Sequence, residues 1–113
     1  MTNASTITRS ELQDAIAAGA VVVVETLGPM YYESGHLPGA INIPHTQVAE
    51  LAAELLPDRD AAIVTYCSNP QCQNSSAVQA QLRSLGYTDV RKYTEGKDDW
   101  SAAGLPLTAG AIA

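Results

Sequence analysis

The chain has 113 residues, which suits one domain with a hydrophobic core and is short for two. Hydrophobic residues make up 46% of it, a globular rather than a disordered composition. Twelve acidic against six basic side chains give a net charge of −6, which argues against nucleic-acid and anionic-membrane partners. The longest apolar run, residues 20–24, is too short to span a membrane. The polar first ten residues do not resemble a secretory signal, so we expect a cytoplasmic protein.

Strand and helix patterns alternate along the chain with short connections. Thr8 and Glu11 have the spacing of a capping box at the start of the first helix. Strand patterns cover residues 6–8, 20–24, 40–43, 61–66 and 89–93. Helical patterns cover residues 10–18, 30–34, 46–56, 97–103 and a segment that begins at Asn74 or Ser75 and ends at Gly86. This order predicts a single α/β domain over residues 6–107, with terminal tails at 1–5 and 108–113. We expect a central, mainly parallel sheet with helices on both faces.

Two of the predicted helices carry an apolar stripe for the core. Helical spacing places Leu55 in the stripe of residues 46–56 and Leu85 in that of the helix before Gly86. We therefore expect both leucines to be buried.

Cys67 occupies the most informative place in the sequence. It follows a buried-strand pattern and begins a loop that enters a helix, so unpaired backbone amides and the helix dipole would favour an anion there. Such surroundings lower the pKa of a thiol and make it a nucleophile. No Lys, Arg or His lies between Cys67 and Ser76, so activation would come from the backbone. The alternative is a small buried side chain without chemistry.

Cys72, five positions after Cys67, has two interpretations of its own. It is either a resolving thiol that closes a disulfide with Cys67, or a structural or solvent-facing cysteine. A reducing compartment would not maintain a structural disulfide over so short a loop, so the pair indicates chemistry rather than a staple.

Four motifs in register resemble the rhodanese-like family of sulfurtransferases. The similarity covers residues 6–107, and its motifs together are more specific than a lone glycine pattern. They are the signature GHLPGAINIP at 35–44, Tyr66-Cys67 at the end of a strand, Leu82, Leu85, Gly86 and Tyr87, and residues 96–100 followed by Gly104-Leu105-Pro106.

The resemblance implies that Cys67 takes a sulfane sulfur from a donor as a persulfide and passes it to a thiol or cyanide. The donor would be thiosulfate, 3-mercaptopyruvate or a persulfide, and the acceptor a small thiol or a thiol-carrying protein. No cofactor and no metal is implied. The amides of the active-site loop would stabilise the negative charge on the outer sulfur. That loop consists of Ser68, Asn69, Pro70, Gln71, Cys72 and Gln73.

The chain departs from the family pattern around this loop. The loop is uncharged where the family often has Arg or Lys, which predicts weak steering of a dianion such as thiosulfate. Glu25 and Leu27 stand where the family usually has aspartate and arginine, and only Glu25 can keep part of their bracing role. His36, within the signature, is a candidate supporting residue that organises a turn. Trp100 either packs in the core or lines the entrance to the loop.

Other functions remain open at this point. Cys67 and Cys72 would also suit a non-enzymatic dithiol/disulfide redox sensor or sulfur relay. Phosphatases and arsenate reductases share the fold, but their loops need an arginine that residues 71–76 lack. A metal site with His36 and His45 is disfavoured, because a predicted strand separates the two histidines. A docking module with an inert cysteine is the last alternative.

Overall fold

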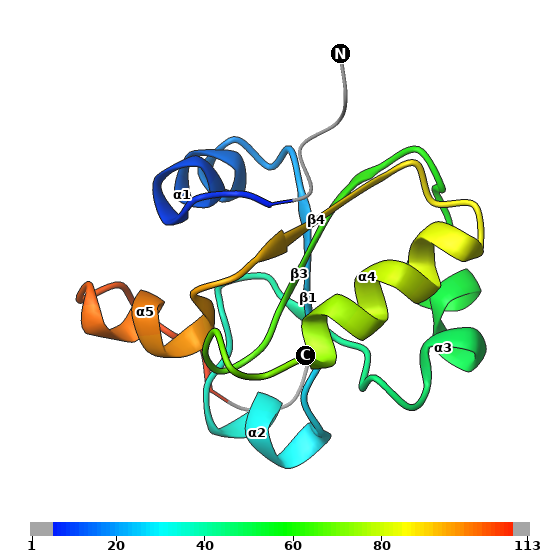
Figure 1. Ribbon diagram of the computed structural model, residues 1–113. Coiled ribbons are helices and arrows are strands. Elements are labelled where there is room, and N and C mark those ends of the chain that lie inside the picture. The colour runs from blue at the N-terminus through cyan, green and yellow to red at the C-terminus, as the bar shows by residue number, and fades with distance from the viewer. Residues whose placement is uncertain (1–5, 110–113) are drawn as a thin grey trace.

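A computed structural model describes residues 6–109 as one α/β domain around a four-stranded, fully parallel sheet (Figure 1). The strand order is β2-β1-β3-β4, so β1 and β3 lie at the centre and pair with each other. The strands are β1 (Val22–Glu25), β2 (Ile41–Asn42), β3 (Ala62–Tyr66) and β4 (Asp89–Tyr93). The helices are α1 (Arg9–Ala17), α2 (Pro29–Ser34), α3 (Val48–Leu55), α4 (Asn74–Ser84) and α5 (Gly96–Ala102). The predicted fold class is confirmed.

The sheet divides the interior into two hydrophobic clusters, one on each face. Successive strand residues point to opposite faces, so Val23 and Val64 join one cluster while Val24 and Ile63 join the other. We call the face covered by α1, α2 and α5 the α1/α5 face, and the opposite one the α3/α4 face (Figure 1). Helices on both faces explain why the central strands read as continuous apolar runs.

The first helix begins as the capping box predicts. The Thr8 hydroxyl accepts from the Glu11 amide at 3.1 Å, and the Glu11 carboxylate accepts from the Thr8 amide at 3.0 Å. These hydrogen bonds lower the pKa of Glu11. The strand expected at residues 6–8 is wrong: only Thr6 forms an isolated parallel bridge, to Lys92. Thr8 does not extend it, because its amide donates to the Glu11 carboxylate and its carbonyl accepts from the Leu12 amide at the start of the helix.

Two expectations at element ends, the burial of Leu55 and that of Leu85, need correction. Leu55 and Leu85 are 36% and 39% exposed, since one ends α3 and the other is the C-cap of α4, where each helix leaves the core. At the other terminus, Thr108 exchanges two backbone hydrogen bonds of 2.8 Å with His36. Backbone pairing thus extends one residue past the boundary expected at Leu107. The expected tail at residues 1–5 lies outside the described residues.

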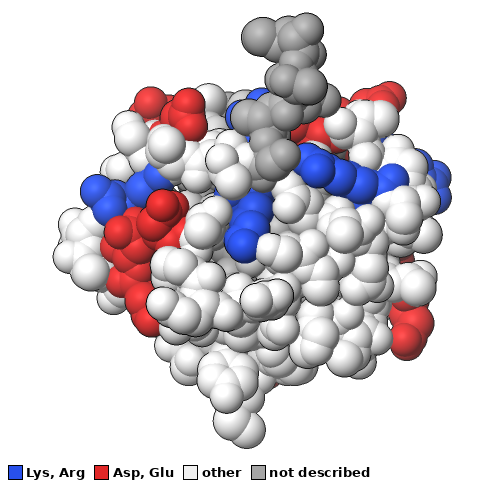
Figure 2. Space-filling model, in the orientation of Figure 1, with Lys and Arg blue, Asp and Glu red and all other residues white. Residues whose placement is uncertain are grey.

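The charged side chains on the face drawn in Figure 2 form small separate groups in its upper and lateral parts. The lower part, where Figure 1 places α2, shows almost no charge. Met30 and Tyr31 of that helix are 81% and 60% exposed. Within residues 6–109, none of the helices is both long and apolar enough to cross a membrane.

Candidate active site

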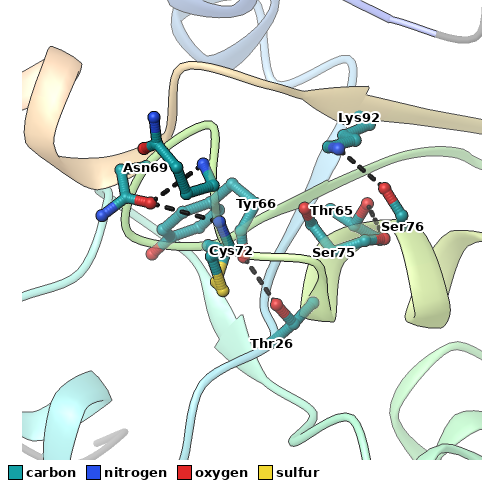
Figure 3. Close-up of a disulfide and its surroundings, with 10 residues drawn as sticks. Thr26, Thr65, Tyr66, Asn69, Cys72, Ser75, Ser76 and Lys92 are labelled. Atoms are coloured by element: carbon teal, nitrogen blue, oxygen red, sulfur yellow. Dashed lines mark hydrogen bonds between the residues drawn. A yellow bond between two sulfur atoms is a disulfide. The ribbon is translucent and has the colours of Figure 1, made fainter.

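Cys67 lies directly after β3, at the carboxyl end of the central strands, and is joined to Cys72 by a disulfide (Figure 3). The Cα atoms of the two cysteines are 6.2 Å apart, within the usual span of a disulfide. Cys67 is 1% exposed, whereas Cys72 is partly exposed. The structure therefore shows the oxidised form of the site, with the same Cys67–Cys72 bond that a resolving thiol would close.

Asn69 folds the loop so that Cys72 returns to Cys67. Its side-chain oxygen, Oδ1, accepts from the amides of Gln71 and Cys72 at 3.1 and 3.2 Å (Figure 3). Its backbone carbonyl also accepts from the Cys72 amide at 3.2 Å. This local turn is a common use of asparagine. The same hydrogen bonds occupy two of the loop amides that the resemblance assigns to the negative charge of the outer sulfur.

The first residues of α5 contact the beginning of the loop, at Cys67 and Ser68. The Lys97 amide donates to the Cys67 carbonyl and the Asp98 amide to the Ser68 carbonyl, both at 2.8 Å. Gly96, at a φ of +76°, packs so closely that a Cβ there would lie 2.7 Å from the Cys67 carbonyl oxygen. Only glycine combines this backbone conformation with so close an approach. Cys67 and Ser68 are thus held by backbone contacts to α5.

A buried carboxylate lies in the same region of the α1/α5 face. Glu25 is fully buried, and its Oε1 accepts from the Tyr66 hydroxyl at 2.7 Å and from Lys97 Nζ at 3.0 Å. Burial, reinforced by the Glu25 charge, raises the pKa of Tyr66 well above its usual range, so its hydroxyl remains a donor. Lys97 Nζ also donates to the Tyr31 carbonyl at 3.0 Å. Glu25 therefore braces the sheet end through α5, the element that contacts Cys67.

The first turn of α4 has no side-chain cap. Gln73 is the N-cap residue and makes no capping hydrogen bond, and the helix begins at Asn74, one of the two starts expected from the sequence. Ser75 is buried, and its carbonyl accepts from Thr65 Oγ1 at 3.1 Å. The Ser76 hydroxyl accepts from Lys92 Nζ of β4 at 2.7 Å (Figure 3). The uncapped turn leaves the positive end of the helix dipole facing the loop.

His36 and Trp100 are both buried side chains. The buried His36 ring stacks on Tyr32 with centroids 3.8 Å apart, and its Nδ1 lies 2.8 Å from the Tyr32 carbonyl. These contacts support the expectation that His36 organises the turn within the signature at 35–44. Trp100 is 2% exposed and donates through Nε1 to the Pro106 carbonyl at 2.9 Å. A side chain this buried cannot line an entrance, so the core interpretation of Trp100 holds and the entrance one is wrong.

Sequence reasoning missed the site roles of Gly96, Lys97 and Asn69. Gly96 appeared only in the motif at 96–100, Lys97 in that motif and in the helix expected at 97–103, and Asn69 only as one of six loop residues. An Asx turn could have been inferred from Asn69-Pro70, a pair that favours turns. Nothing local in the sequence marks the contacts from α5. Across residues 6–109, no three His, Cys, Asp or Glu side chains are grouped so as to hold a metal ion.

Comparison with known proteins identifies the family. A family model described as "Rhodanese-like domain" matches residues 8–103. The HTH-type transcriptional regulator Rv0324 of Mycobacterium tuberculosis is 40% identical over 93% of this chain, which spans only 45% of that protein's length. The thiosulfate sulfurtransferase PspE of Escherichia coli is 37% identical over 62% of this chain and 65% of its own.

Solved structures agree with this match. A structure described as "rhodanese with anions from E. coli" superimposes with a TM-score of 0.67 at 30% identity, covering 80% of this chain and all of the other. The BH2092 protein of Bacillus halodurans reaches a TM-score of 0.86 over 94% of this chain and 77% of its own; at 24% identity it supports the fold alone. The resemblance inferred from the motifs is therefore confirmed, and the chain belongs to the rhodanese-like domain family.

Proposed function

We propose that this chain is a sulfurtransferase in which the Cys67 thiolate carries a sulfane sulfur as a persulfide. The observation that supports this most directly is the position of Cys67 at the carboxyl end of the central strand β3, in a loop entering the uncapped first turn of α4. Ligands of open parallel sheets bind at this edge. Relatives named as thiosulfate sulfurtransferases, in Escherichia coli and in Pseudomonas syringae, add support.

The reaction begins from the reduced site. The Cys67 thiolate attacks the outer sulfur of the donor, a Cys67 Sγ–S bond forms, and the donor leaves as sulfite, pyruvate or a thiol. The acceptor, a thiol or cyanide, then attacks that outer sulfur and restores the thiolate. Across residues 6–109, the amides of Ser68, Asn69 and Gln73 donate to no protein acceptor, so these three are our candidates for holding the persulfide charge.

The surroundings of the loop favour a donor of low charge. The loop has no charged residue, the chain has a net charge of −6, and the neighbouring helix α2 exposes Met30 and Tyr31. A dianion gains little attraction from such a surface. We therefore propose a persulfide, small or carried by a protein, as the preferred donor, with thiosulfate and 3-mercaptopyruvate as weaker ones. The cytoplasmic setting expected from the sequence remains a prediction.

Intact-protein mass spectrometry tests the proposal. The reduced Cys72→Ser variant, in which Cys67 is the one remaining cysteine, is exposed separately to thiosulfate, to 3-mercaptopyruvate and to a polysulfide, with Cys67→Ser as the matched variant. We expect the mass of one sulfur atom to be added at Cys67, fastest with polysulfide, and no addition to Cys67→Ser. If no donor adds sulfur to any form that retains Cys67, the chain is not a sulfurtransferase.

The disulfide supports a second candidate, a dithiol/disulfide redox sensor or relay that transfers no sulfur. The 40% identical relative is named a transcriptional regulator, which is consistent with a sensing role for a domain of this kind. The same experiment distinguishes the two functions. A relay loses two hydrogen atoms on mild oxidation, needs both cysteines for that loss, and gains no sulfur from any donor.

A further inference from the structure

We propose that Cys72 gives the Cys67 persulfide a second route of release: Cys72 attacks Cys67, sulfur leaves as hydrogen sulfide, and a dithiol reductant is the second substrate of this route. This inference rests on the proposed function, because it starts from the persulfide at Cys67. It assigns the Cys67–Cys72 disulfide to a step of turnover instead of to stabilisation.

The loop is built to bring the two sulfurs together. Cys67 is held in place by α5, through the hydrogen bond from the Lys97 amide and the close packing of Gly96. Cys72 is brought back toward it by the turn at Asn69. The bond itself shows that Cys72 Sγ reaches Cys67 Sγ without leaving this fold. Because both thiols share one short loop, their reaction is intramolecular and gains the corresponding effective concentration.

The proposed step balances without any external oxidant. The Cys72 thiolate attacks Cys67 Sγ, the new disulfide bond forms, and the bond between Cys67 Sγ and the outer sulfur breaks. The outer sulfur takes that electron pair together with the proton that the Cys72 thiol gave up, and leaves as hydrosulfide. The sulfane sulfur is thereby reduced and the two cysteines are oxidised. A dithiol of the reductant then returns two electrons and two protons, becoming a disulfide itself.

The unequal exposure of the two cysteines determines where the reductant attacks. Cys67 is 1% exposed and Cys72 is partly exposed, so the reductant's thiolate reaches the Cys72 sulfur. Cys67 then leaves as a thiolate, ready for the next donor, and the mixed disulfide stays on Cys72. A second thiol of the same reductant resolves it, which is why a dithiol fits this site better than a monothiol.

The test compares the wild-type chain with Cys72→Ser after one equivalent of polysulfide sulfur has been added to each reduced protein. We expect Cys72→Ser to retain the added sulfur atom. We expect the wild type to lose two hydrogen atoms from its mass and to release one sulfide per chain. Dithiothreitol should then restore the wild type for a second round, whereas an equal concentration of thiol groups from glutathione should do so more slowly.

The outcomes separate this inference from the proposed function. If Cys72→Ser gains no sulfur from any donor, the sulfurtransferase proposal itself fails. If Cys72→Ser and the wild type both retain the added sulfur and no sulfide appears, the sulfurtransferase stands and the role of Cys72 is wrong. Peptide mapping after brief exposure of the disulfide form to a limiting monothiol should locate the mixed disulfide on Cys72; finding it on Cys67 contradicts the assigned point of attack.

Asn69 provides an independent check as a positioning residue. Asn69→Ala removes the Oδ1 acceptor of the Gln71 and Cys72 amides, so we expect sulfide release to slow by about tenfold. Asn69→Asp keeps a side-chain oxygen at the same position and should restore most of the rate. If sulfide release slows equally in both variants, the turn at Asn69 does not position Cys72 for its attack on Cys67.

Discussion

The α3/α4 face and the α1/α5 face of the sheet bury comparable apolar clusters but different polar groups. On the α3/α4 face the Tyr87 hydroxyl donates to the carbonyls of Ala52 and Leu56, and Thr65 donates to that of Ser75. These are neutral groups bonded to backbone. The α1/α5 face instead buries the carboxylate of Glu25 with the ammonium of Lys97, which is 13% exposed.

The difference between the two faces bears on two separate properties, the stability of the fold and the geometry of the site. Neutral hydroxyls bonded to backbone carbonyls disturb a core little, whereas a buried ion pair must offset a large desolvation cost. The charged pair lies on the face whose helix α5 contacts the Cys67 loop. We infer that the α3/α4 face mainly supports the fold, while the α1/α5 face also fixes the loop. Changes on the two faces should therefore differ in their effects on the free energy of unfolding and on sulfur loading.

The largest effect is expected from a cavity in the α3/α4 face. Leu82 is fully buried there, so Leu82→Ala should lower the free energy of unfolding by about 3–5 kcal/mol. Urea denaturation measures the loss. Sulfur loading per folded molecule should stay at the wild-type rate, because Leu82 contacts the scaffold only. A loading rate that falls in proportion to stability would contradict the division between the two faces.

Glu25→Ala should cost about 3 kcal/mol, because it leaves the Lys97 ammonium and the Tyr66 hydroxyl without their acceptor. Lys97 keeps the Tyr31 carbonyl, which limits the loss. Urea denaturation of Glu25→Ala, Lys97→Met and the double variant gives the coupling between the two side chains. We expect the double variant to be more stable than Glu25→Ala alone. A cost under about 1 kcal/mol would mean that the pair behaves like one on the surface.

Gly96→Ala should cost about 1–3 kcal/mol and slow sulfur loading by about 100-fold. The added Cβ would lie 2.7–2.8 Å from backbone atoms of Cys67, Ser68 and Asn69, so the loop must move. Gly104→Ala is the matched control: its φ of +80° imposes similar backbone strain, but nothing lies within 4 Å of the new Cβ. If the control slows loading as strongly, the effect comes from strain and not from contact with the loop.

The sequence allowed the elements and the position of Cys67 to be predicted, because their signals are local. The strand at Asp89–Tyr93 was predicted with its observed bounds, and the Thr8–Glu11 capping box follows from spacing alone. The support of the loop could not be predicted in this way. The contact of Gly96 with Cys67 and the pairing of Glu25 with Lys97 join residues far apart in the chain, and they exist only once α5 packs against the carboxyl ends of the strands.

The smallest effect is expected at the exposed edge of the α1/α5 face. The Tyr93 hydroxyl donates to Asp99 Oδ2 at 2.6 Å, and Arg9 Nη1 donates to both carboxylate oxygens at 2.9 and 3.0 Å. These hydrogen bonds, that of Tyr93 first, lower the pKa of Asp99. Since the folded state then binds the proton less readily than the unfolded chain, Asp99 stabilises the fold above the unfolded pKa of about 4. That contribution is lost as the pH falls through the folded pKa.

Asp99→Asn cannot titrate, so its deficit in the free energy of unfolding should shrink as the pH falls. The Asp99 side chain is 29% exposed, which limits the deficit at neutral pH to under about 1 kcal/mol. Urea denaturation at about pH 7 and about pH 3 measures both ends of this range. Tyr93→Phe, which retains the Arg9 pair, should show a weaker pH dependence than the wild type but more than Asp99→Asn. A deficit that is constant across this range would mean that the Asp99 charge adds nothing to the stability of this face.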